Sequence, residues 1–325
     1  MAHILQFENV SKSYKSESSI VRACQSVNLT ISEGQVVGLV GESGSGKSTL
    51  ANLALGLETL DSGSIKFNGV DLKDQLHDKS RGFRRDVQAV FQHPFLSLDS
   101  RKTIAWSIAE PLVINKIGTG ASRTAKVQEL MAAVALDKDF GQKYPSQLSG
   151  GQLQRVNIAR ALALDPKLLI CDEPVSALDV SVQAQIVNLF LDIQKRLGVA
   201  MLFISHDLAV VRHVSDRIVV MYAGKIMEVG DTDDICASPI HPYTQALLAA
   251  STLKIENESE REKLQLFRKE EVPHSGCPFA PRCVHAISHC REREVTAELF
   301  SSDRITSCLR AQELFSENFH AREKS

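Results

Sequence analysis

The chain has 325 residues, of which 43% are hydrophobic, so it can form one large core and a smaller additional unit. Its 37 basic and 39 acidic residues give a net charge of −2, so the chain as a whole has no electrostatic footprint for nucleic acid. The net charge leaves local basic patches open, but no nucleic-acid partner is expected. No stretch has the roughly 18–20 apolar residues of a membrane-spanning helix, and the start, Met1-Ala2-His3-Ile4, does not resemble a secretion signal. We expect a cytoplasmic chain that reaches a membrane only through protein partners.

The first part of the chain predicts two kinds of strand. Alternation of apolar and polar residues in 4–10 and 21–31 indicates antiparallel strands. The apolar run 36–40 predicts a strand buried on both faces, followed by a helix from Lys47 to about Gly56. Further strands are expected at 65–67, before an Asn68-Gly69 turn, and at 87–91. Residues 102–164 predict several helices, with breaks near 118–120 and 144–145.

The second part repeats the alternation of strand and helix. Buried strands are predicted at 168–171 and 200–204, separated by an amphipathic helix over 181–197 and followed by a hairpin over 217–229. This order predicts an α/β fold with a parallel-sheet core, an antiparallel β subdomain and a helical subdomain over about 93–165. We expect one domain over 1–251, a linker over 252–272 and a small cysteine-rich extension over 273–325.

The segment from Gly41 to Thr49, GESGSGKST, fits the phosphate-loop pattern, and it lies between a predicted buried strand and a predicted helix. Glycines allow a tight loop whose backbone N–H groups, with the helix N-terminus, attract phosphate oxygens. Lys47 is expected to reach the β- and γ-phosphates of ATP, and the Ser48 hydroxyl to ligate Mg²⁺. The predicted contacts to the nucleotide are Gly41, Ser43, Gly44, Ser45, Gly46, Lys47, Ser48 and Thr49.

Two carboxylates, Asp172 and Glu173, follow the predicted strand at 168–171. They would lie at the carboxyl edge of a parallel sheet, where open α/β folds bind ligands. Such a pair alone is more often a solvated turn, but the phosphate loop upstream favours catalysis. Asp172 is predicted to hold Mg²⁺, and Glu173 to act as the general base for the attacking water.

The segment Leu148-Ser149-Gly150-Gly151-Gln152 opens a predicted helix some twenty residues before Asp172. In isolation it would be a serine-capped helix. In this position the chain resembles the ABC ATPase family. The resemblance implies that Ser149, Gly150, Gly151 and Gln152 close over the γ-phosphate bound by an opposite subunit, so that two domains sandwich two ATP molecules.

Other family positions match in order, and the resemblance covers residues 4–250. It implies that Tyr14 stacks on adenine, that Gln92 links the metal and the water to a membrane subunit, and that His206 senses the γ-phosphate. Asp179, in Ser176-Ala177-Leu178-Asp179, would contact the partner ATPase. A lone aromatic or histidine is more often a packing residue. The implied catalytic residues are Glu173, His206 and Gln92, with Ser48, Gln92 and Asp172 at the metal.

Two further segments, 93–101 (HPFLSLDSR) and 238–248 (SPIHPYTQALL), resemble hallmarks of oligopeptide and dipeptide importer ATPases. The resemblance implies a peripheral protein on the cytoplasmic face of the inner membrane. Its partners would be a second ABC ATPase in a heterodimer, two transmembrane permease subunits and an extracytoplasmic solute-binding protein.

Other functions stay open at the level of the sequence. The importer branch also contains nickel and opine or metallophore importers, and the catalytic motifs do not encode the direction of transport, which leaves an exporter subunit open. A soluble ABC ATPase acting on DNA or ribosomes is disfavoured, since those usually carry two cassettes or a long coiled coil, and this sequence has one phosphate loop and no sustained heptads.

The cysteines fall into two groups. Cys24, Cys171 and Cys236 lie among apolar or small neighbours and are expected to be buried thiols. Cys277, Cys283, Cys290 and Cys308 crowd into a segment too small for its own core, which predicts a structural metal centre. Their spacing is not that of common zinc folds. Some members of the importer branch carry a four-iron, four-sulfur cluster at a similar set of cysteines, so this cluster is favoured over zinc or free thiols.

Overall fold

The computed structural model describes residues 2–15, 20–77, 82–252, 273, 275–301 and 303–322. The expected linker at 252–272 therefore lies outside the described residues, except for Thr252. Within the described part, no helix is both long and apolar enough to cross a membrane.

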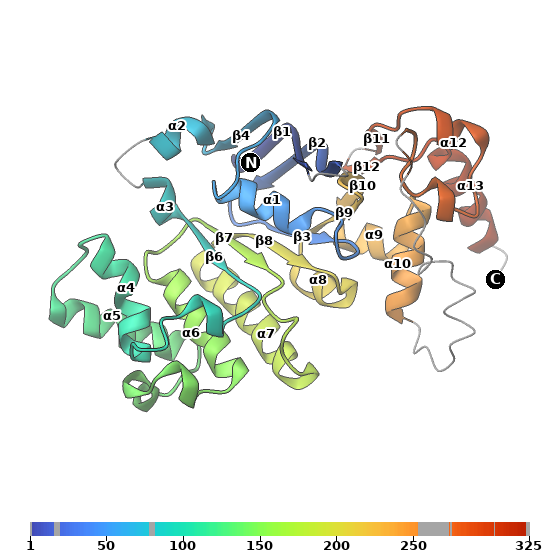
Figure 1. Cartoon of the computed structure of the whole chain (residues 1–325). Helices are drawn as coiled ribbons and strands as arrows, with labels where there is room; N and C mark the ends of the chain where they lie inside the picture. Colours follow the sequence, from blue (N-terminus) through green and yellow to red (C-terminus); the bar gives the residue numbers. More distant parts are fainter. Residues whose placement is uncertain are drawn as a thin grey trace.

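A mixed sheet of eight strands forms the centre of the molecule, in the order β11-β12-β10-β9-β3-β8-β7-β6 (Figure 1). Five neighbouring strands are parallel: β9 (Arg217–Tyr222), β3 (Val36–Val40), β8 (Ala200–Ser205), β7 (Leu168–Asp172) and β6 (Val87–Val90). β9 turns into the antiparallel β10 (Lys225–Asp231) through the predicted hairpin. The parallel core predicted from the strand–helix alternation is confirmed.

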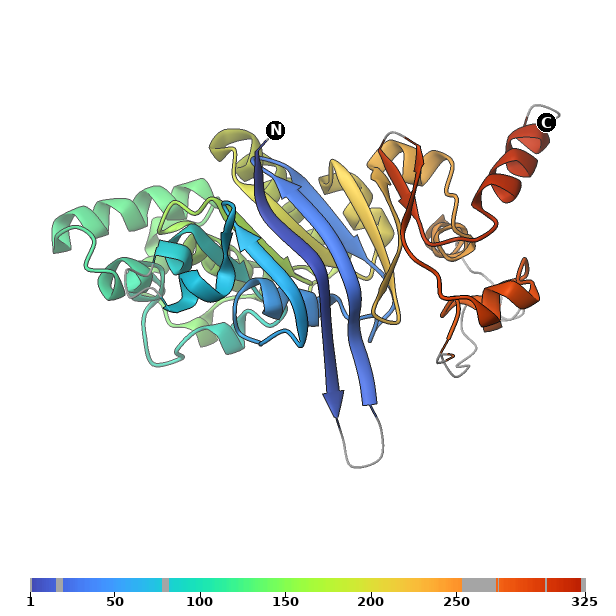
Figure 2. The same cartoon turned by 90° about the horizontal axis from the view of Figure 1, so that it is seen from above.

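A second, antiparallel sheet packs against this core in the order β2-β1-β4-β5. Its strands are β1 (His3–Lys15), β2 (Ile20–Ser32), β4 (Ser62–Phe67) and β5 (Val70–Asp71). β1 runs well beyond the predicted end at residue 10, because its pairing with β2 continues to Lys15, whereas β2 exceeds the predicted range of 21–31 by one residue at each end. In Figure 2 their long hairpin, in dark blue and blue, extends past the rest of the molecule.

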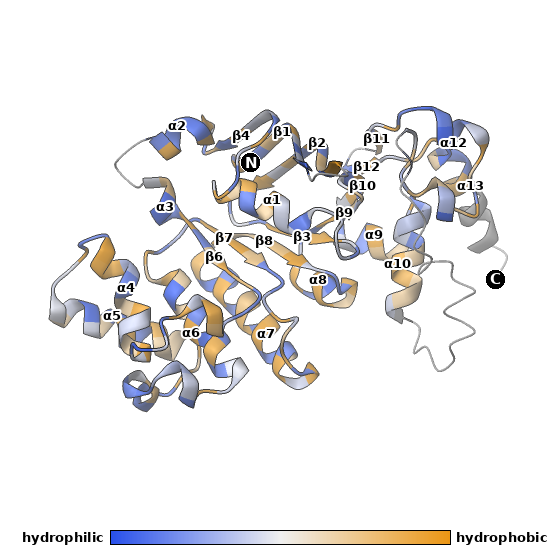
Figure 3. Cartoon of the chain, viewed as in Figure 1, coloured by the Kyte–Doolittle hydropathy of each residue, from blue (hydrophilic) through white to orange (hydrophobic). Residues whose placement is uncertain are grey.

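The central strand β3 shows how the layers are built, because all five of its residues are buried. Val37 and Leu39 belong to the core shared with α1 (Lys47–Ala54) and the antiparallel sheet. Val36 and Val40 face the opposite core, shared with α7 (Val180–Leu197) and α8 (Leu208–Val214). Figure 3 shows the resulting apolar centre, with the strands of the core sheet in orange.

The helical lobe consists of α4 (Ile104–Ile114), α5 (Gly120–Ala133) and α6 (Gly150–Leu162), in green in Figure 1. Three short 3₁₀ turns accompany them: η1 (Phe95–Ser97), η2 (Lys138–Gln142) and η3 (Pro145–Gln147). The predicted break at 118–120 is confirmed, whereas 134–149 contains 3₁₀ turns in place of α-helix. Pro145 begins η3 and Lys143 is extended, which prevents a continuous helix there.

The remaining helices before residue 253 are α2 (Leu72–His77), α3 (Gly82–Asp86), α9 (Thr232–Ala237) and α10 (Pro242–Thr252).

The C-terminal segment is joined to the core sheet, which the sequence did not indicate. Its elements are η4 (Ala280–Arg282), α12 (Ser288–Glu292), β11 (Glu298–Ser301), β12 (Arg304–Thr306) and α13 (Ala311–Arg322). β12 pairs with β10 and so extends the eight-stranded sheet. Glu228 in β10 is fully buried and accepts a hydrogen bond from Arg304 Nη2 at 2.7 Å and from the backbone N–H of Ile240 and of His241 at 2.9 Å. A buried ion pair in which both oxygens of Glu228 are hydrogen-bonded thus joins this segment to the core.

Gly38, in the middle of β3, allows the close approach of α8. A Cβ added there would lie 2.2 Å from Val211 Cγ1 and 2.3 Å from Ser215 Oγ. We expect Gly38→Ala to lower the free energy of unfolding by about 1–3 kcal/mol, the usual cost of overpacking. Urea denaturation measures this, with Gly120→Ala at the start of α5 as control, where a Cβ meets nothing within 4 Å. Equal stability of the two variants would contradict the packing described.

Candidate active site

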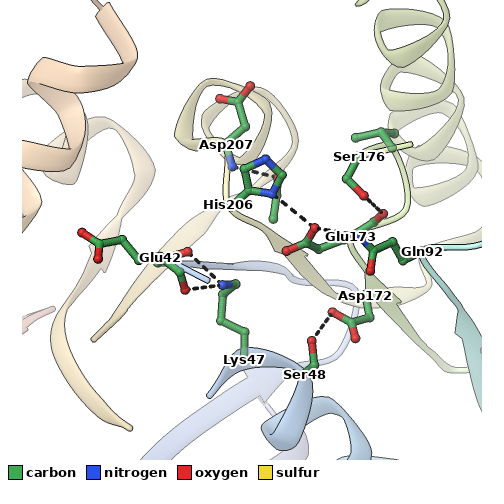
Figure 4. Close-up of polar contacts among 12 residues, drawn as sticks. Glu42, Lys47, Ser48, Gln92, Asp172, Glu173, Ser176, His206 and Asp207 are labelled. Atoms are coloured by element: carbon green, nitrogen blue, oxygen red, sulfur yellow. Dashed lines mark hydrogen bonds and ion pairs between the residues drawn. The ribbon is translucent and has the colours of Figure 1, made fainter. Parts of the chain in front are cut away.

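The chemically active side chains gather at one edge of the core sheet. β3, β8, β7 and β6 are neighbours and parallel, so their carboxyl ends meet at the same edge. The phosphate loop follows β3, His206 follows β8, Asp172 and Glu173 end β7, and Gln92 follows β6. Figure 4 shows these side chains pointing toward one another. The structure therefore brings together residues that are up to 165 positions apart in the sequence.

The phosphate loop is shaped by backbone contacts that only glycine permits. A Cβ at Gly41 would lie 2.0 Å from the carbonyl oxygen of Met221. Gly46, with φ of 104°, would place a Cβ 2.0 Å from the carbonyl oxygen of Ala23. Both clashes are with backbone that cannot move aside, so these positions exclude every side chain.

Lys47 is buried at the start of α1, with 4% of its surface exposed. Its Nζ donates hydrogen bonds to the carbonyl oxygens of Gly41 at 2.8 Å and Glu42 at 2.9 Å. Burial lowers the pKa of Lys47, while the negative charges of Glu173 and Asp172 act in the opposite direction. A desolvated cation at the mouth of a glycine loop is suited to bind an anion such as phosphate.

Asp172 and Ser48 bring two oxygen atoms suited to ligate a metal ion close to Lys47. Ser48 Oγ donates a hydrogen bond to Asp172 Oδ1 at 3.1 Å. Burial raises the pKa of Asp172; the Ser48 hydrogen bond lowers it, and the charge of Glu173 raises it again. A hydroxyl and a partly desolvated carboxylate are the hard oxygen ligands that Mg²⁺ prefers, so this pair fits a magnesium ion.

Glu173 is the centre of the remaining contacts. Its Oε2 lies 3.2 Å from His206 Nδ1 and 3.4 Å from Gln92 Nε2. Its backbone has a φ of 47°, a left-handed conformation that costs a glutamate about 1–3 kcal/mol. The bond from its N–H to the carbonyl oxygen of Ile204, at 3.0 Å, holds this conformation in place. Strain at one carboxylate within a polar cluster is typical of a functional residue.

Ser149, Gly150, Gly151 and Gln152 lie together at the N-terminus of α6, apart from this polar cluster. Ser149 Oγ accepts a bond from the N–H of Gln152 at 3.4 Å, and Gln152 Oε1 accepts one from the N–H of Ser149 at 2.9 Å. Ser149 thus caps the helix, which is the role expected of this segment in isolation. A Cβ at Gly151 would lie 2.5 Å from Val182 Cγ1, so the glycine allows α6 to contact the start of α7.

Asp179 belongs to this second group, because it caps α7 with a bond of 2.9 Å from the N–H of Val182. Tyr14 lies in β1, on the long hairpin, and is 38% exposed; Lys12 Nζ is 5.3 Å from the centre of its ring. Neither contact identifies a ligand, so the predicted contacts of Asp179 with a partner and of Tyr14 with adenine stay predictions.

All seven cysteines lie in the described residues and are free thiols. Cys24 and Cys171 are buried as expected, and burial raises the pKa of both thiols. The expectation for Cys236 is wrong, since it is only half-buried. It lies in the last turn of the short helix α9, on the rim of the core.

The four C-terminal cysteines line one small pocket, together with His241 and His285. The pKa of Cys277 is raised to about 12 and that of Cys308 to about 11, mainly by burial and to a smaller extent by the other thiols of the group. In the described part of the chain, no three histidine, cysteine, aspartate or glutamate side chains converge closely enough to hold a metal ion. The structure therefore brings the four thiols to one place without forming a compact single-metal site.

Sequence reasoning missed the residues that support the phosphate loop from behind. Glu42 was not singled out within the loop, yet it contacts Tyr243 and Arg282 from the C-terminal part of the chain. Tyr243 lies in a segment identified only by resemblance. Arg282 carries no signal in the sequence other than its place between Cys277 and Cys283.

Because folding raises the pKa of Asp172, its ionised form destabilises the folded chain. This cost is present at pH 7 and disappears as the pH falls through the raised pKa. We expect Asp172→Asn to raise the free energy of unfolding at pH 7 by roughly 0.5–2 kcal/mol, and the difference to shrink toward pH 4. Urea denaturation across this pH range measures it.

The control is Asp231→Asn, at an exposed position that makes no side-chain cap bond. It should change stability by less than about 0.5 kcal/mol at every pH. A loss of stability in Asp172→Asn at pH 7 would contradict the described electrostatics.

Comparison with protein families gives two matches along the chain. A model described as "ABC transporter" matches residues 24–176, which contain the phosphate loop, the α6 tip and the two carboxylates. A model described as "Oligopeptide/dipeptide transporter, C-terminal region" matches residues 227–290, which run from β10 into α12 and include Cys277, Cys283 and Cys290.

Two curated relatives and one solved structure illustrate the similarity. "Di/tripeptide transport ATP-binding protein DppF" of Pseudomonas aeruginosa is 44% identical over 90% of this chain and 91% of its own length. "Putative oligopeptide transport ATP-binding protein YkfD" of Bacillus subtilis is 43% identical over 89% of each chain. The dimeric post-hydrolysis structure of the ATP-binding cassette MJ0796, bound to ADP and phosphate, superposes with a TM-score of 0.64 at 32% identity, covering 70% of this chain and 98% of that one.

Motifs, fold and near full-length similarity agree: the chain belongs to the family of ABC transporter ATP-binding proteins, and it binds and hydrolyses ATP.

Proposed function

We propose that the chain is the ATP-hydrolysing subunit of an importer that takes up short peptides, dipeptides or oligopeptides, across the cytoplasmic membrane. The observation that carries the ATP-hydrolysing role is the convergence of Lys47, Ser48, Asp172 and Glu173 at one sheet edge. The two relatives named above are described as peptide transport proteins, and the C-terminal match carries the same description. These descriptions favour peptides over nickel, opines or metallophores. Other relatives, 44% identical over 88% of this chain, are described as putative peptide import proteins, which favours import over export.

The division of the chain follows the same proposal. Residues 1–251 form the nucleotide-binding domain, with the helical subdomain at about 93–165; a linker at 252–272 leads to the cysteine-rich extension at 273–325. The distinct helical lobe of α4, α5 and α6 supports the division of this domain into a core and a helical subdomain. The pairing of β12 with β10 indicates that the extension is anchored to the nucleotide-binding domain.

ATP binding requires the phosphate loop and an adenine contact. Backbone N–H groups of residues 43–49 and the Lys47 ammonium would hold the β- and γ-phosphates, and the exposed ring of Tyr14 would stack on the base. Ser48, Asp172 and Gln92 would hold Mg²⁺, which when bound neutralises charge on the phosphate oxygens.

Hydrolysis is assigned to Glu173. Its carboxylate accepts a proton from the attacking water while the water oxygen bonds to the γ-phosphorus and the bond to the ADP oxygen breaks. His206 and Gln92 both contact Glu173 Oε2, so they hold this carboxylate, and they would contact the γ-phosphate and the water when ATP is bound. The products are ADP and phosphate.

A second ATPase subunit would complete the site. The N-terminus of α6, with Ser149, Gly150, Gly151 and Gln152, would cover the γ-phosphate held by the partner. Ser149 and Gly150 are exposed, and Val180, at the start of α7, is 82% exposed, so this surface is accessible to a second subunit. Asp179, next to Val180, would contact the partner across the interface. By resemblance the partner is a related chain, giving a heterodimer.

The contact with the permeases is assigned to a groove between β6, η1 and the helical lobe. Phe91, Leu96 and Ile114 line this groove, and Leu96 is 80% exposed. A groove with both apolar and charged lining residues, next to Gln92, would transmit closure of the ATPase dimer to two transmembrane subunits. By resemblance, the chain would lie on the cytoplasmic face of the inner membrane, and an extracytoplasmic solute-binding protein would deliver the peptide.

Replacing the proposed base tests this mechanism. We expect Glu173→Gln to bind ATP normally, to lower steady-state ATPase activity by about 100- to 10,000-fold, and to trap the ATP-bound dimer. The assay uses the chain co-expressed with its partner ATPase and permeases. Cells carrying the variant should also lose uptake of radiolabelled dipeptides.

The matched control is Glu129→Gln, on the exposed side of α5. It should retain both ATPase activity and uptake. Unchanged ATPase activity in Glu173→Gln would refute the catalytic assignment. Normal peptide uptake in cells without the chain, with loss of nickel uptake, would refute the peptide assignment.

We also propose that Cys277, Cys283, Cys290 and Cys308 hold a four-iron, four-sulfur cluster. In such a cluster each thiolate binds a different iron, so the four sulfurs lie further apart than around one zinc ion. What supports this proposal is that all four thiols line one pocket, so the four donors that the cluster needs lie near one another. The cluster would stabilise a segment that has little core of its own.

Elemental analysis tests the cluster directly. Protein purified without oxygen should contain about four iron and four sulfide per chain. Cys290→Ser should lower the iron content, whereas Cys236→Ser, in the half-buried thiol outside the pocket, should not. Stoichiometric zinc without iron would contradict the proposal.

A further inference from the structure

Glu42, the second residue of the phosphate loop, is held at each of its polar groups. Its N–H donates to Tyr243 Oη at 3.0 Å, and its carbonyl oxygen accepts from Lys47 Nζ at 2.9 Å. Its carboxylate accepts two hydrogen bonds from Arg282, Nη1 to Oε2 at 3.0 Å and Nη2 to Oε1 at 2.8 Å. The nucleotide-binding lysine and two residues from the C-terminal part of the chain thus meet on one residue.

Arg282 is locked in this position by its surroundings. Its side chain is only 5% exposed, and its guanidinium lies 5.5 Å from the ring centres of both Tyr222 and Phe279. Nη1 also donates to Tyr222 Oη at 3.0 Å. A planar fork held between aromatic rings fits a carboxylate in two-point geometry, which a lysine ammonium cannot reproduce.

The two partners of this ion pair differ in burial, so the loss of the contact affects them differently. The Glu42 side chain is 37% exposed, so without Arg282 its carboxylate can be hydrated and the loop can move. Arg282 has no comparable access to water, so without Glu42 its charge stays buried and unpaired. The arginine is therefore the fixed side of the contact, and the loop is the side that is held.

We propose that Arg282 is a positioning residue for nucleotide binding: by holding Glu42 it fixes the loop carbonyl that orients Lys47, so the C-terminal segment sets the affinity of the phosphate loop for ATP. This inference rests on the proposed function of the same site. Since Arg282 lies between Cys277 and Cys283, a displacement of that cysteine-bearing turn would move Arg282 and thereby change the position of Glu42 in the phosphate loop.

Equilibrium binding of ATP to the full-length chain tests the inference. Arg282→Gln should raise the dissociation constant for ATP about tenfold, equivalent to about 1.4 kcal/mol, while kcat at saturating ATP in the assembled transporter changes less than about twofold. Arg282→Lys should recover only part of the affinity, because it keeps the charge without the fork. In a Glu42→Gln background, Arg282→Gln should weaken ATP binding no further.

The control is Arg310→Gln, because Arg310 makes its ion pair with Glu313 inside the C-terminal segment. It should retain wild-type affinity for ATP even if it lowers the melting temperature. Unchanged ATP affinity in folded Arg282→Gln and Arg282→Lys, or an equal loss in Arg310→Gln, would overturn the inference and leave the proposed function intact. A wild-type chain that fails to bind ATP would overturn both.

Discussion

The site depends on one constraint, the parallel pairing of β3, β8, β7 and β6. In this register Val40 lies beside Ser205, and Asp172 beside Ile204, so the residues that follow each strand emerge at the same height. No local feature of the chain could bring Lys47, Asp172 and His206 together without it. The two cores that cover the faces of the sheet are therefore what holds the chemistry in place.

The same edge is where the fold carries unfavourable features. Lys47 and Asp172 are both partly desolvated. Burial lowers the pKa of Lys47 and raises that of Asp172, and both shifts favour the neutral form of the side chain. Glu173 adopts a left-handed backbone conformation. Such features persist only where surrounding structure over-determines them, and here they surround the place where phosphate and a cation would balance the charges.

The C-terminal segment is integrated with the ATPase at two points. Arg304 forms a buried pair with Glu228 on the core sheet, and Arg282 pairs with Glu42 in the phosphate loop. The pocket lined by the four cysteines includes Cys277 and Cys283, on either side of Arg282 in the sequence, and His241, whose backbone N–H bonds Glu228. A structural centre in this pocket would therefore act on elements that contact the nucleotide site, as well as on its own segment.

The sequence by itself determined the phosphate loop, the order of strands and helices and the carboxylates after β7, because each depends on residues close together in the chain. Only the tertiary structure decided that the three-residue strand β12 extends the core sheet, that Cys236 lies at its rim, and that Arg282 reaches Glu42. These contacts join residues far apart in sequence. No periodic pattern in the sequence marks these residues, so their contacts follow only from how the folded chain packs.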